Sequence, residues 1–311
     1  MNTVKPLISI KNLNVWYKTK KVLNGISFDI EEGKTIGLVG ESGCGKTTIG
    51  LSIMGLLPKD AKVYGTIEYK EKNILSFSQS ELQKIRGSKI SIIFQDPKSY
   101  LDPLFTVGNQ IKETILSHQK LSKKEANNMT IELLKKVGIP KPEIRMNEYP
   151  HSFSGGMLQR VMIAQAISSN PELLIADEPT TALDVTIQAQ ILNLLHELKD
   201  EIGMSILLIT HNFGIIAQMS DYVVVIYGGE VFEIGESIEI FDNPFHPYTK
   251  LLISSISKQI ASFENGIFPR DEQISGCKFY IRCKEKIKDC KNIHPIMREV
   301  KRGHFVMCHR I

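Results

Sequence analysis

One eight-residue stretch limits the fold more than any other part of this 311-residue chain. It reads GESGCGKT, covers residues 40–47, and lies between an apolar run, TIGLV, and a segment with helical character. The pattern G-x-x-x-x-G-K-[ST] in that context is typical of a loop whose backbone N–H groups wrap a phosphate. Glycines are needed because a Cβ would keep phosphate oxygens away from these groups. The sequence therefore predicts an α/β core that binds a phosphorylated ligand at the end of a strand.

The same loop supplies candidate ligands for a nucleotide. Lys46 is expected to bridge the β- and γ-phosphates, Thr47 to coordinate Mg²⁺, and Thr48 to help on the phosphates. The helix that follows points its positive end at the same anion. The alternative is a glycine-rich turn with an incidental lysine. The predicted nucleotide-binding residues here are Gly40, Glu41, Ser42, Gly43, Cys44, Gly45, Lys46, Thr47 and Thr48.

Side chains that follow other apolar strands complete the predicted catalytic set. LLIADEP carries Asp177 to the end of a buried strand, where it is expected to hold Mg²⁺ from its outer coordination sphere. Glu178 would then orient or deprotonate the attacking water. His211, after SILLIT, is expected to contact the γ-phosphate and hold Glu178, and Gln95, after SIIF, to reach Mg²⁺ and the water. Tyr17 is a candidate for stacking on adenine. Each residue also has an ordinary structural interpretation as a turn, cap or packing residue.

Strands and helices alternate along most of the chain. Strands are expected at the start and at the apolar runs, a helix at about 46–57, and a largely helical region from about 98 to 170. VVVIYGGEVFEIG predicts a hairpin around Gly228 and Gly229. NPFHPYTKLLISSI is interpreted as the start of a linker, and residues 257–276 as polar and turn-rich. This alternation favours an α/β fold with a parallel sheet.

Composition and charge restrict the class of protein. No apolar run approaches the length of a membrane span, and the start of the chain lacks a secretory pattern, so we expect a cytoplasmic protein. The net charge is +4, but residues 277–311 hold ten Lys or Arg against three Asp or Glu. A nucleic-acid binder more often spreads its basic residues over a reading face, so no nucleic-acid partner is expected.

Four of the five cysteines lie in this basic tail, spaced C-x5-C-x6-C-x17-C. In a reducing compartment, thiols at that density favour a metal over disulfides. Zinc suits four thiolates, although the short C-x2-C spacing of zinc ribbons is missing. Reduced structural cysteines on a solvated tail are the remaining alternative. The candidate ligands are Cys277, Cys283, Cys290 and Cys308.

GESGCGKTT, IIFQDP, FSGGMLQRV, LLIADEPTTALD and LLITH, in this order, resemble the nucleotide-binding subunit of an ATP-binding cassette (ABC) transporter. The resemblance covers residues 7 to about 255. It implies a P-loop NTPase cassette with a RecA-like parallel-sheet core, an N-terminal antiparallel β subdomain and an α-helical signature subdomain at about 98–170. It also implies an ATPase whose hydrolysis of ATP to ADP and phosphate is coupled to translocation.

The resemblance implies that each ATP is bound between two cassettes packed head to tail. Ser154, Gly155 and Gly156 would face the γ-phosphate held by the loop of the partner subunit, with helix N–H groups meeting the anion. Asp184 resembles the D-loop residue that runs along this interface. Nucleotide would then close the dimer, and hydrolysis would loosen it.

FSGGMLQR departs from the common LSGGQ in two places, Phe153 and Met157. Met157 also occurs in peptide-transporting members of the family. Leu158 stands where many relatives carry a basic residue, which would alter a contact near the partner's phosphates. The backbone donors are unaffected by these changes.

NPFHPYTKLLISSI and the cysteine tail resemble the subgroup that imports oligopeptides, dipeptides and nickel or metal chelates. LIADEPTTALDVTIQAQIL is similar to the first of that subgroup's two ATPase subunits. The resemblance implies a heterodimer with a second ATPase, two permeases contacted through Gln95 and the helical segment after it, and an external solute-binding protein. The chain would lie on the cytoplasmic side of the membrane. It would form a cassette over residues 1–255 and a small Cys-rich C-terminal extension over 256–311, whose four cysteines ligate an iron–sulfur cluster of the [4Fe–4S] type.

Two other functions are compatible with the motifs. A soluble ATPase of this fold serving DNA repair or translation would usually carry long coiled-coil insertions or two cassettes in one chain, and neither is present. A non-catalytic regulatory cassette would not need Lys46, Asp177, Glu178 and His211 together.

Overall fold

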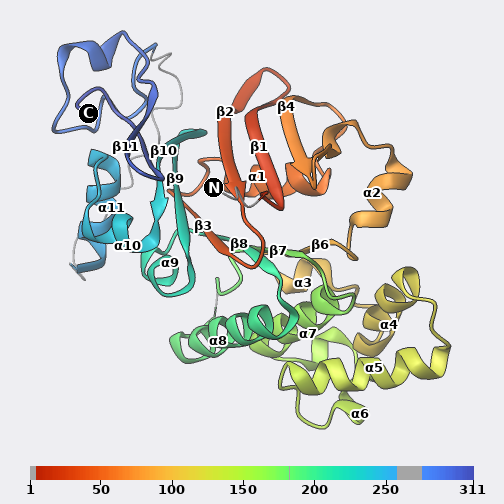
Figure 1. Cartoon of the computed structure of the whole chain (residues 1–311). Coiled ribbons are helices and arrows are strands. Elements are labelled where there is room, and N and C mark those ends of the chain that lie inside the picture. Colours follow the sequence, from red (N-terminus) through yellow and green to blue (C-terminus); the bar gives the residue numbers. More distant parts are fainter. Residues whose placement is uncertain (1–4, 182, 258–274) are drawn as a thin grey trace. The chain divides into compact units, whose positions relative to one another are not determined.

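The computed structural model describes residues 5–181, 183–257 and 275–311, which form two compact units (Figure 1). One unit contains the residues up to 73 and those from 208 onward, and the other contains residues 74–207. The division falls inside strand β8, Ser205–Thr210. Each unit has its own buried core and carries a different part of the predicted site.

The first unit begins with an antiparallel sheet of order β2-β1-β4-β5. Its buried and exposed residues alternate along the second half of β2, so Ile26, Phe28 and Ile30 face the core. This sheet confirms the predicted N-terminal β subdomain. Its strands are β1 (Ile8–Tyr17), β2 (Lys20–Ile30), β4 (Ala61–Tyr69) and β5 (Lys72–Asn73).

A second sheet in this unit carries the phosphate loop. Strand β3 pairs in parallel with β9, which forms an antiparallel hairpin with β10; β10 pairs with β12, and β12 with β11. Gly228 and Gly229 connect β9 to β10 with φ values of 54° and 78°, so the predicted hairpin is confirmed. The strands are β3 (Thr35–Val39), β9 (Tyr222–Tyr227), β10 (Glu230–Glu236), β11 (Met297–Lys301) and β12 (His304–Met307).

The helices of this unit include one that the sequence analysis missed. The predicted linker is wrong at its start, because residues 247–257 form helix α11. Pro247 occupies the first position of this helix, where its missing N–H costs nothing. Most of the predicted turn-rich segment, residues 258–274, lies outside the described residues. The helices are α1 (Lys46–Met54), α9 (Phe213–Met219), α10 (Ser237–Asp242), α11 (Pro247–Ser257) and the 3-10 turn Lys288–Lys291.

The second unit is mainly helical, as predicted for residues 98–170, and contains the parallel pair β6 and β7. Helix α5 carries a capping box at Ser122 and is closed after its C-cap Val137 by Gly138, whose φ of 77° is left-handed. The elements are β6 (Ile90–Ile93), β7 (Leu173–Asp177), α2 (Gln79–Ile85), α3 (Pro97–Tyr100), α4 (Val107–His118), α5 (Lys123–Lys136), α6 (Pro142–Arg145), α7 (Gly155–Ile167), α8 (Val185–Ile202) and the 3-10 turns Ile74–Ser76 and Pro150–Ser152.

None of the helices within the described ranges combines the length and the apolar character that a membrane crossing requires.

Candidate nucleotide site

The phosphate loop connects β3 to α1 and approaches its surroundings closely. A Cβ on Gly40 would lie 2.1 Å from the backbone oxygen of Ile226, so only glycine fits there. Gly43 and Gly45 adopt φ values of 78° and 106°, which glycine reaches without strain. The sequence thus bends the backbone into a cradle, and this cradle suits an anion of phosphate size.

Lys46 is 5% exposed, and its ammonium group lies on the loop that carries it. The Nζ atom donates to the backbone oxygens of Gly40 at 2.8 Å and Glu41 at 3.1 Å. It also lies 3.9 Å from Sγ of Cys44. Cys44 is buried, and burial raises the pKa of its thiol. The loop therefore holds a cation at its centre through two backbone carbonyl oxygens and a contact with the Cys44 sulfur.

The first turn of α1 presents the other predicted ligands. Thr47 is exposed at the start of the helix, while Thr48 is buried. The hydroxyl of Tyr17, on β1, donates to Oγ1 of Thr48 at 3.4 Å. The side chain of Tyr17 is only partly exposed, so it has a packing role here in addition to any contact with a base.

The acidic residues lie at the end of β7 in the second unit. Asp177 is 4% exposed as the last residue of this buried strand. Glu178 follows it with a φ of 48°, a left-handed conformation that costs energy for a residue with a side chain. Its Oε2 accepts a hydrogen bond from the hydroxyl of Thr181 at 2.6 Å. Strained residues cluster at functional sites, and Glu178 is the residue predicted to act on water.

Gln95 and His211 also follow strands, as predicted. Gln95 lies two residues after β6 in the second unit, and His211 directly follows β8 in the first. Both are exposed. The first unit therefore carries Tyr17, residues 40–48 and His211, whereas the second carries Gln95, Asp177 and Glu178.

The FSGGMLQR segment caps a helix. Ser154 is the N-cap of α7, and its Oγ accepts a hydrogen bond from the N–H of Met157 at 3.3 Å. Gly155 and Gly156 form the first turn, whose N–H groups have no partner within the helix. A Cβ on Gly156 would lie 2.7 Å from Cγ2 of Ile187, on α8, so the small residue also permits close helix packing.

Asp184 caps that neighbouring helix, accepting a hydrogen bond from the N–H of Ile187 at 2.9 Å. Two N-termini, of α7 and α8, are thus built side by side within the second unit. Phe153 is 7% exposed and Leu158 is 2% exposed. Leu158 therefore contributes to the core of the unit, where a basic side chain at the same position would have to leave the core to reach a phosphate.

The four tail cysteines line one small cavity of the first unit, together with His246. The N–H of Cys277 donates to the oxygen of Cys290 at 2.9 Å, which ties two of the cysteine loops together. Burial raises the pKa of the Cys277 thiol to about 12, and the neighbouring thiols add to the effect. Burial likewise raises the pKa of Cys283 and Cys308.

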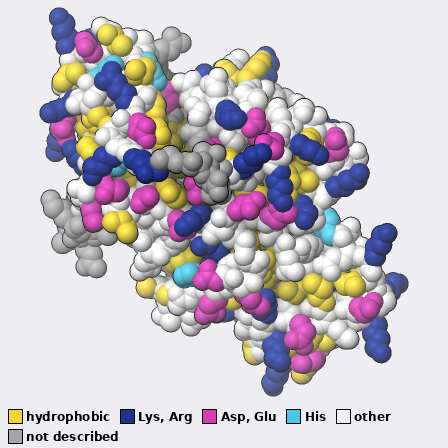
Figure 2. Space-filling model, in the orientation of Figure 1, with side chains coloured by type: hydrophobic (Ala, Val, Ile, Leu, Met, Phe, Trp, Pro, Cys, Tyr) yellow, Lys and Arg dark blue, Asp and Glu magenta, His cyan; other side chains and the backbone are white. Residues whose placement is uncertain are grey.

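Over the described ranges, no group of three or more His, Cys, Asp or Glu side chains is arranged to hold a metal ion. On the face shown in Figure 2, Lys and Arg side chains surround this extension.

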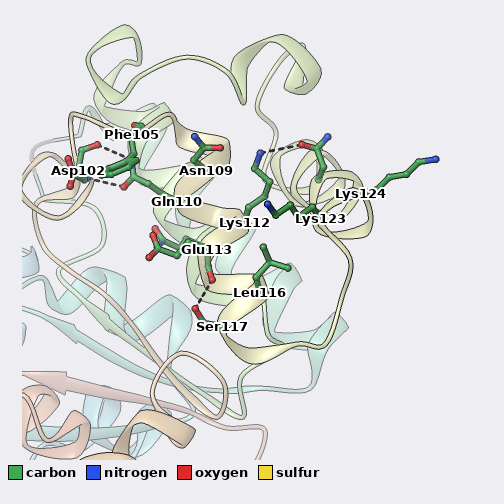
Figure 3. A pocket seen from close by; sticks show the side chains of 12 residues that line it. Asp102, Phe105, Asn109, Gln110, Lys112, Glu113, Leu116, Ser117, Lys123 and Lys124 are labelled. Carbon is green, nitrogen blue, oxygen red and sulfur yellow. Dashed lines mark hydrogen bonds between the residues drawn. The ribbon is translucent and has the colours of Figure 1, made fainter.

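The second unit also contains an open groove of ≈ 1170 Å³ that the motifs did not reveal (Figure 3). The buried side chain of Gln110 organises its rim: Nε2 donates to the backbone oxygens of Asp102 at 2.9 Å and Phe105 at 3.0 Å. Phe105 is 54% exposed on this rim, and the preceding residue, Leu104, is 78% exposed. An apolar pair in the proline-containing sequence LDPLFT, at the edge of a predicted helix, was the available signal for an exposed contact surface.

The fold and these loops define an ATP-hydrolysing cassette, the class of protein in which a phosphate loop works with a serine–glycine helix cap. The chain belongs to the ABC transporter family, since the family description "ABC transporter" matches residues 23–181. A second description, "Oligopeptide/dipeptide transporter, C-terminal region", matches residues 232–290. The chain is thus an ATPase of this family, as the ordered motifs predicted.

Known proteins agree with this assignment over almost the whole chain. The "Dipeptide transport ATP-binding protein DppD" of Bacillus subtilis is 43% identical, with 98% of this chain and 95% of the relative covered. The "Probable peptide ABC transporter ATP-binding protein y4tR" of Sinorhizobium fredii is 41% identical over the same shares. A solved dimeric structure of the ATP-binding cassette MJ0796, in a post-hydrolysis state with ADP and phosphate, matches with a TM-score of 0.66 and 27% identity. That match covers 74% of this chain and 98% of that chain.

Proposed function

We propose that this chain is the ATP-hydrolysing subunit of a peptide importer and works as a dimer with a second, related ATPase on the cytoplasmic side of two permeases. The observation that carries the proposal is the combination, in one chain, of a complete phosphate loop and a C-terminal region that matches the oligopeptide/dipeptide transporters. The names of the relatives favour peptides as cargo over nickel or metal chelates. An external solute-binding protein would deliver the cargo.

Residues 40–48 would bind the phosphates of ATP. The glycine cradle and the start of α1 supply N–H donors, and Lys46 supplies a positive charge that moves from loop carbonyls to the phosphates. Thr47, Gln95 and Asp177 would hold Mg²⁺, which neutralises phosphate charge when bound. Tyr17 would pack against the base.

Glu178 would take the proton of the attacking water, with His211 and Gln95 orienting the γ-phosphate and the water. The hydrogen bond from Thr181 and the left-handed backbone fix the direction in which the Glu178 carboxylate points. This arrangement supports the assignment because a general base has to be held in one geometry.

Ser154, Gly155 and Gly156 would contact ATP held by the partner ATPase, with Asp184 beside them. The uncommitted N–H groups at the start of α7 support this role, since they have no partner within their own helix. The match to a cassette solved as a dimer with ADP and phosphate points the same way.

The groove of the second unit would receive a helix of a permease. Phe105 offers apolar contact area on its rim, while Lys112, Glu113 and Lys124 line its sides (Figure 3). Gln95 and the segment after it would thereby connect nucleotide chemistry to the permease.

The extension would hold a [4Fe–4S] cluster through Cys277, Cys283, Cys290 and Cys308. The cysteines fit such a group because all four line one cavity, and the basic surroundings would offset the cluster's negative charge. Each of the four irons of such a cluster needs one thiolate, so four cysteines match its number of irons. Iron and acid-labile sulfide in protein purified without air would support the cluster, and stoichiometric zinc would contradict it.

The central test is Glu178→Gln in the assembled transporter. The variant is expected to bind ATP as the wild type does and to lose at least a hundredfold in phosphate release, because general-base catalysis typically contributes on the order of 10²–10⁴. Uptake of a radiolabelled dipeptide by the same transporter should stop. Unchanged hydrolysis would remove Glu178 from the mechanism, and hydrolysis that stops without any effect on peptide uptake would contradict the assigned transport function.

A further inference from the structure

The C-terminal extension contacts the phosphate loop directly. Arg282, between two of the cysteines, donates from Nη1 to Oε2 of Glu41 at 2.8 Å, although the two residues are 241 positions apart. Both side chains are about four-fifths buried, with 22% and 20% exposed. Glu41 is the first variable residue of the phosphate loop. The contact lies entirely within the first unit.

Aromatic side chains surround this ion pair. The hydroxyl of Tyr248, on α11, accepts a hydrogen bond from the N–H of Glu41 at 3.1 Å. Arg282 also donates to the hydroxyl of Tyr227 at 3.4 Å. Phe279, three residues before Arg282, packs at 5.3 Å between ring centroids against both tyrosines. Helix α11 therefore holds the backbone of Glu41, and the extension holds its side chain.

A carboxylate at this position creates an electrostatic problem for nucleotide binding. Glu41 belongs to the loop that has to accept the negative charges of a triphosphate, and like charges repel strongly where the surroundings exclude water. Its second oxygen, Oε1, is buried and has no hydrogen-bond partner among the described residues. Arg282 offsets this charge and turns the carboxylate toward the extension. The guanidinium of an arginine is always charged at physiological pH, so this ion pair persists under the conditions of ATP binding.

We propose that Arg282 is a positioning residue for ATP binding. It offsets the charge of Glu41 and turns the carboxylate toward the extension, which reduces the repulsion between Glu41 and a triphosphate bound in the loop. The proposal rests on the assignment of residues 40–48 as the phosphate site. The extension would then have a role in nucleotide binding, and this role does not depend on the cluster proposed for its four cysteines.

The test is the affinity of the full-length chain, in the assembled transporter, for the non-hydrolysable analogue AMP-PNP. Arg282→Gln is expected to weaken binding roughly three- to tenfold, the effect of losing one partly buried charge-assisted hydrogen bond. In steady-state hydrolysis the same change should raise KM and leave kcat nearly unaffected. Arg282→Lys should recover part of the loss, because it restores the charge without the guanidinium geometry.

Two further measurements separate positioning from a general loss of structure. Glu41→Gln combined with Arg282→Gln should return the affinity to within about twofold of the Glu41→Gln protein, since the repelling charge is gone. The difference in AMP-PNP affinity between Arg282→Gln and wild type should also become smaller at higher salt concentration, because ions screen the repulsion between Glu41 and the phosphates. Lys301→Gln is the matched control: it removes one positive charge of the extension, at an exposed pair with Glu239, and should leave the affinity unchanged.

Three outcomes would overturn the proposal. Wild-type affinity in Arg282→Gln, while Lys46→Ala abolishes binding, would show that the ion pair has no part in nucleotide binding. The double variant Glu41→Gln with Arg282→Gln could bind AMP-PNP as weakly as the single variant Arg282→Gln. That result would show that Arg282 does not act through Glu41. Wild-type affinity in Lys46→Ala would show that the phosphate site itself is wrongly assigned, and the proposal would fail with it.

Discussion

Individual positions of the phosphate loop differ in how strictly they require glycine. Gly40 has no room for a Cβ, since one would lie 2.1 Å from the backbone oxygen of Ile226. A Cβ on Gly43 would meet nothing within 4 Å, so this position needs glycine only for its φ of 78°. The motif fixes Gly40 and leaves Gly43 at a variable position, but it gives no reason for the difference, because the spacing of a pattern carries no information about a strand more than 180 positions later.

This difference predicts unequal effects of two alanine substitutions. Gly40→Ala should lower the free energy of unfolding by about 2–4 kcal/mol, in the range of severe overpacking against backbone. Gly43→Ala should cost only about 1 kcal/mol, the penalty for a left-handed alanine. Denaturant titration of the purified full-length chain measures both. Equal losses in the two variants would contradict the role assigned to the Ile226 contact.

At the residue scale, contacts between residues far apart in the sequence could not be predicted from the sequence. Lys46, Thr47, Asp177 and Glu178 were identifiable because each belongs to a short motif beside a strand. The partner of Glu41 was not, because Arg282 lies 241 positions away and no periodicity links the two. The strained backbone at Glu178 was equally invisible, since it depends on how β7 ends.

Among the elements, helix α11 shows why its prediction as a linker was wrong. Two prolines in NPFHPYT suggested an irregular segment, yet Pro247 begins the helix. His246 caps it: Nδ1 accepts a hydrogen bond from the N–H of Tyr248 at 3.0 Å. Histidine is an uncommon cap, so the usual Ser, Thr, Asp or Asn signal was missing. By contrast, the strands at TIGLV, LLIAD and SILLIT were predictable, because continuous apolar runs of that length fit buried parallel strands.

The histidine cap predicts a pH dependence of stability. Burial lowers the pKa of His246 from 6.5 to about 4. The unfolded chain therefore takes up a proton at this residue below about pH 6.5, and the folded chain does so only near pH 4. The contribution of His246 to the free energy of unfolding is therefore fully present above pH 6.5. It decreases by about 3 kcal/mol as the pH falls from 6.5 to about 4.

The measurement is the free energy of unfolding of wild type and His246→Gln from pH 7 to pH 4. Their difference isolates this group from the other titrating side chains. His246→Gln should be less stable at pH 7, because the cap is altered, and should lose less stability on acidification. Parallel curves for the two proteins would show that His246 does not titrate as described.

At the scale of the whole molecule, the proposed dimer divides this chain between two ATP sites. Its phosphate loop would serve one site, and Ser154 with Gly155 and Gly156 would serve the other. A single sequence could indicate such a split only through resemblance, since nothing in FSGGMLQR itself identifies a ligand. The partner's contribution depends on residues that this chain does not contain.

This division predicts different occupancies for two variants in the complex with the partner ATPase. Lys46→Ala should remove AMP-PNP from one site of the dimer, and Ser154→Arg should remove it from the other, because a bulky side chain would block the start of α7. Combining both changes in one chain should remove nucleotide from both sites. Equilibrium dialysis measures the stoichiometry. A combined variant that retains the occupancy of Lys46→Ala alone would mean that both residues serve the same site.

The pairing of β10 with β12 has a consequence for synthesis of the protein. Glu233, fully buried on β10, meets His304 on β12 at 2.8 Å, and these residues are 71 positions apart. A ribosome adding roughly 5–20 residues per second would need on the order of ten seconds to deliver the second after the first. During that interval the nascent chain presents an open strand edge and a carboxylate without its counterpart. Chains that stop between Glu233 and His304 would therefore expose this strand edge and tend to aggregate, and folding should depend most on chaperones during that interval.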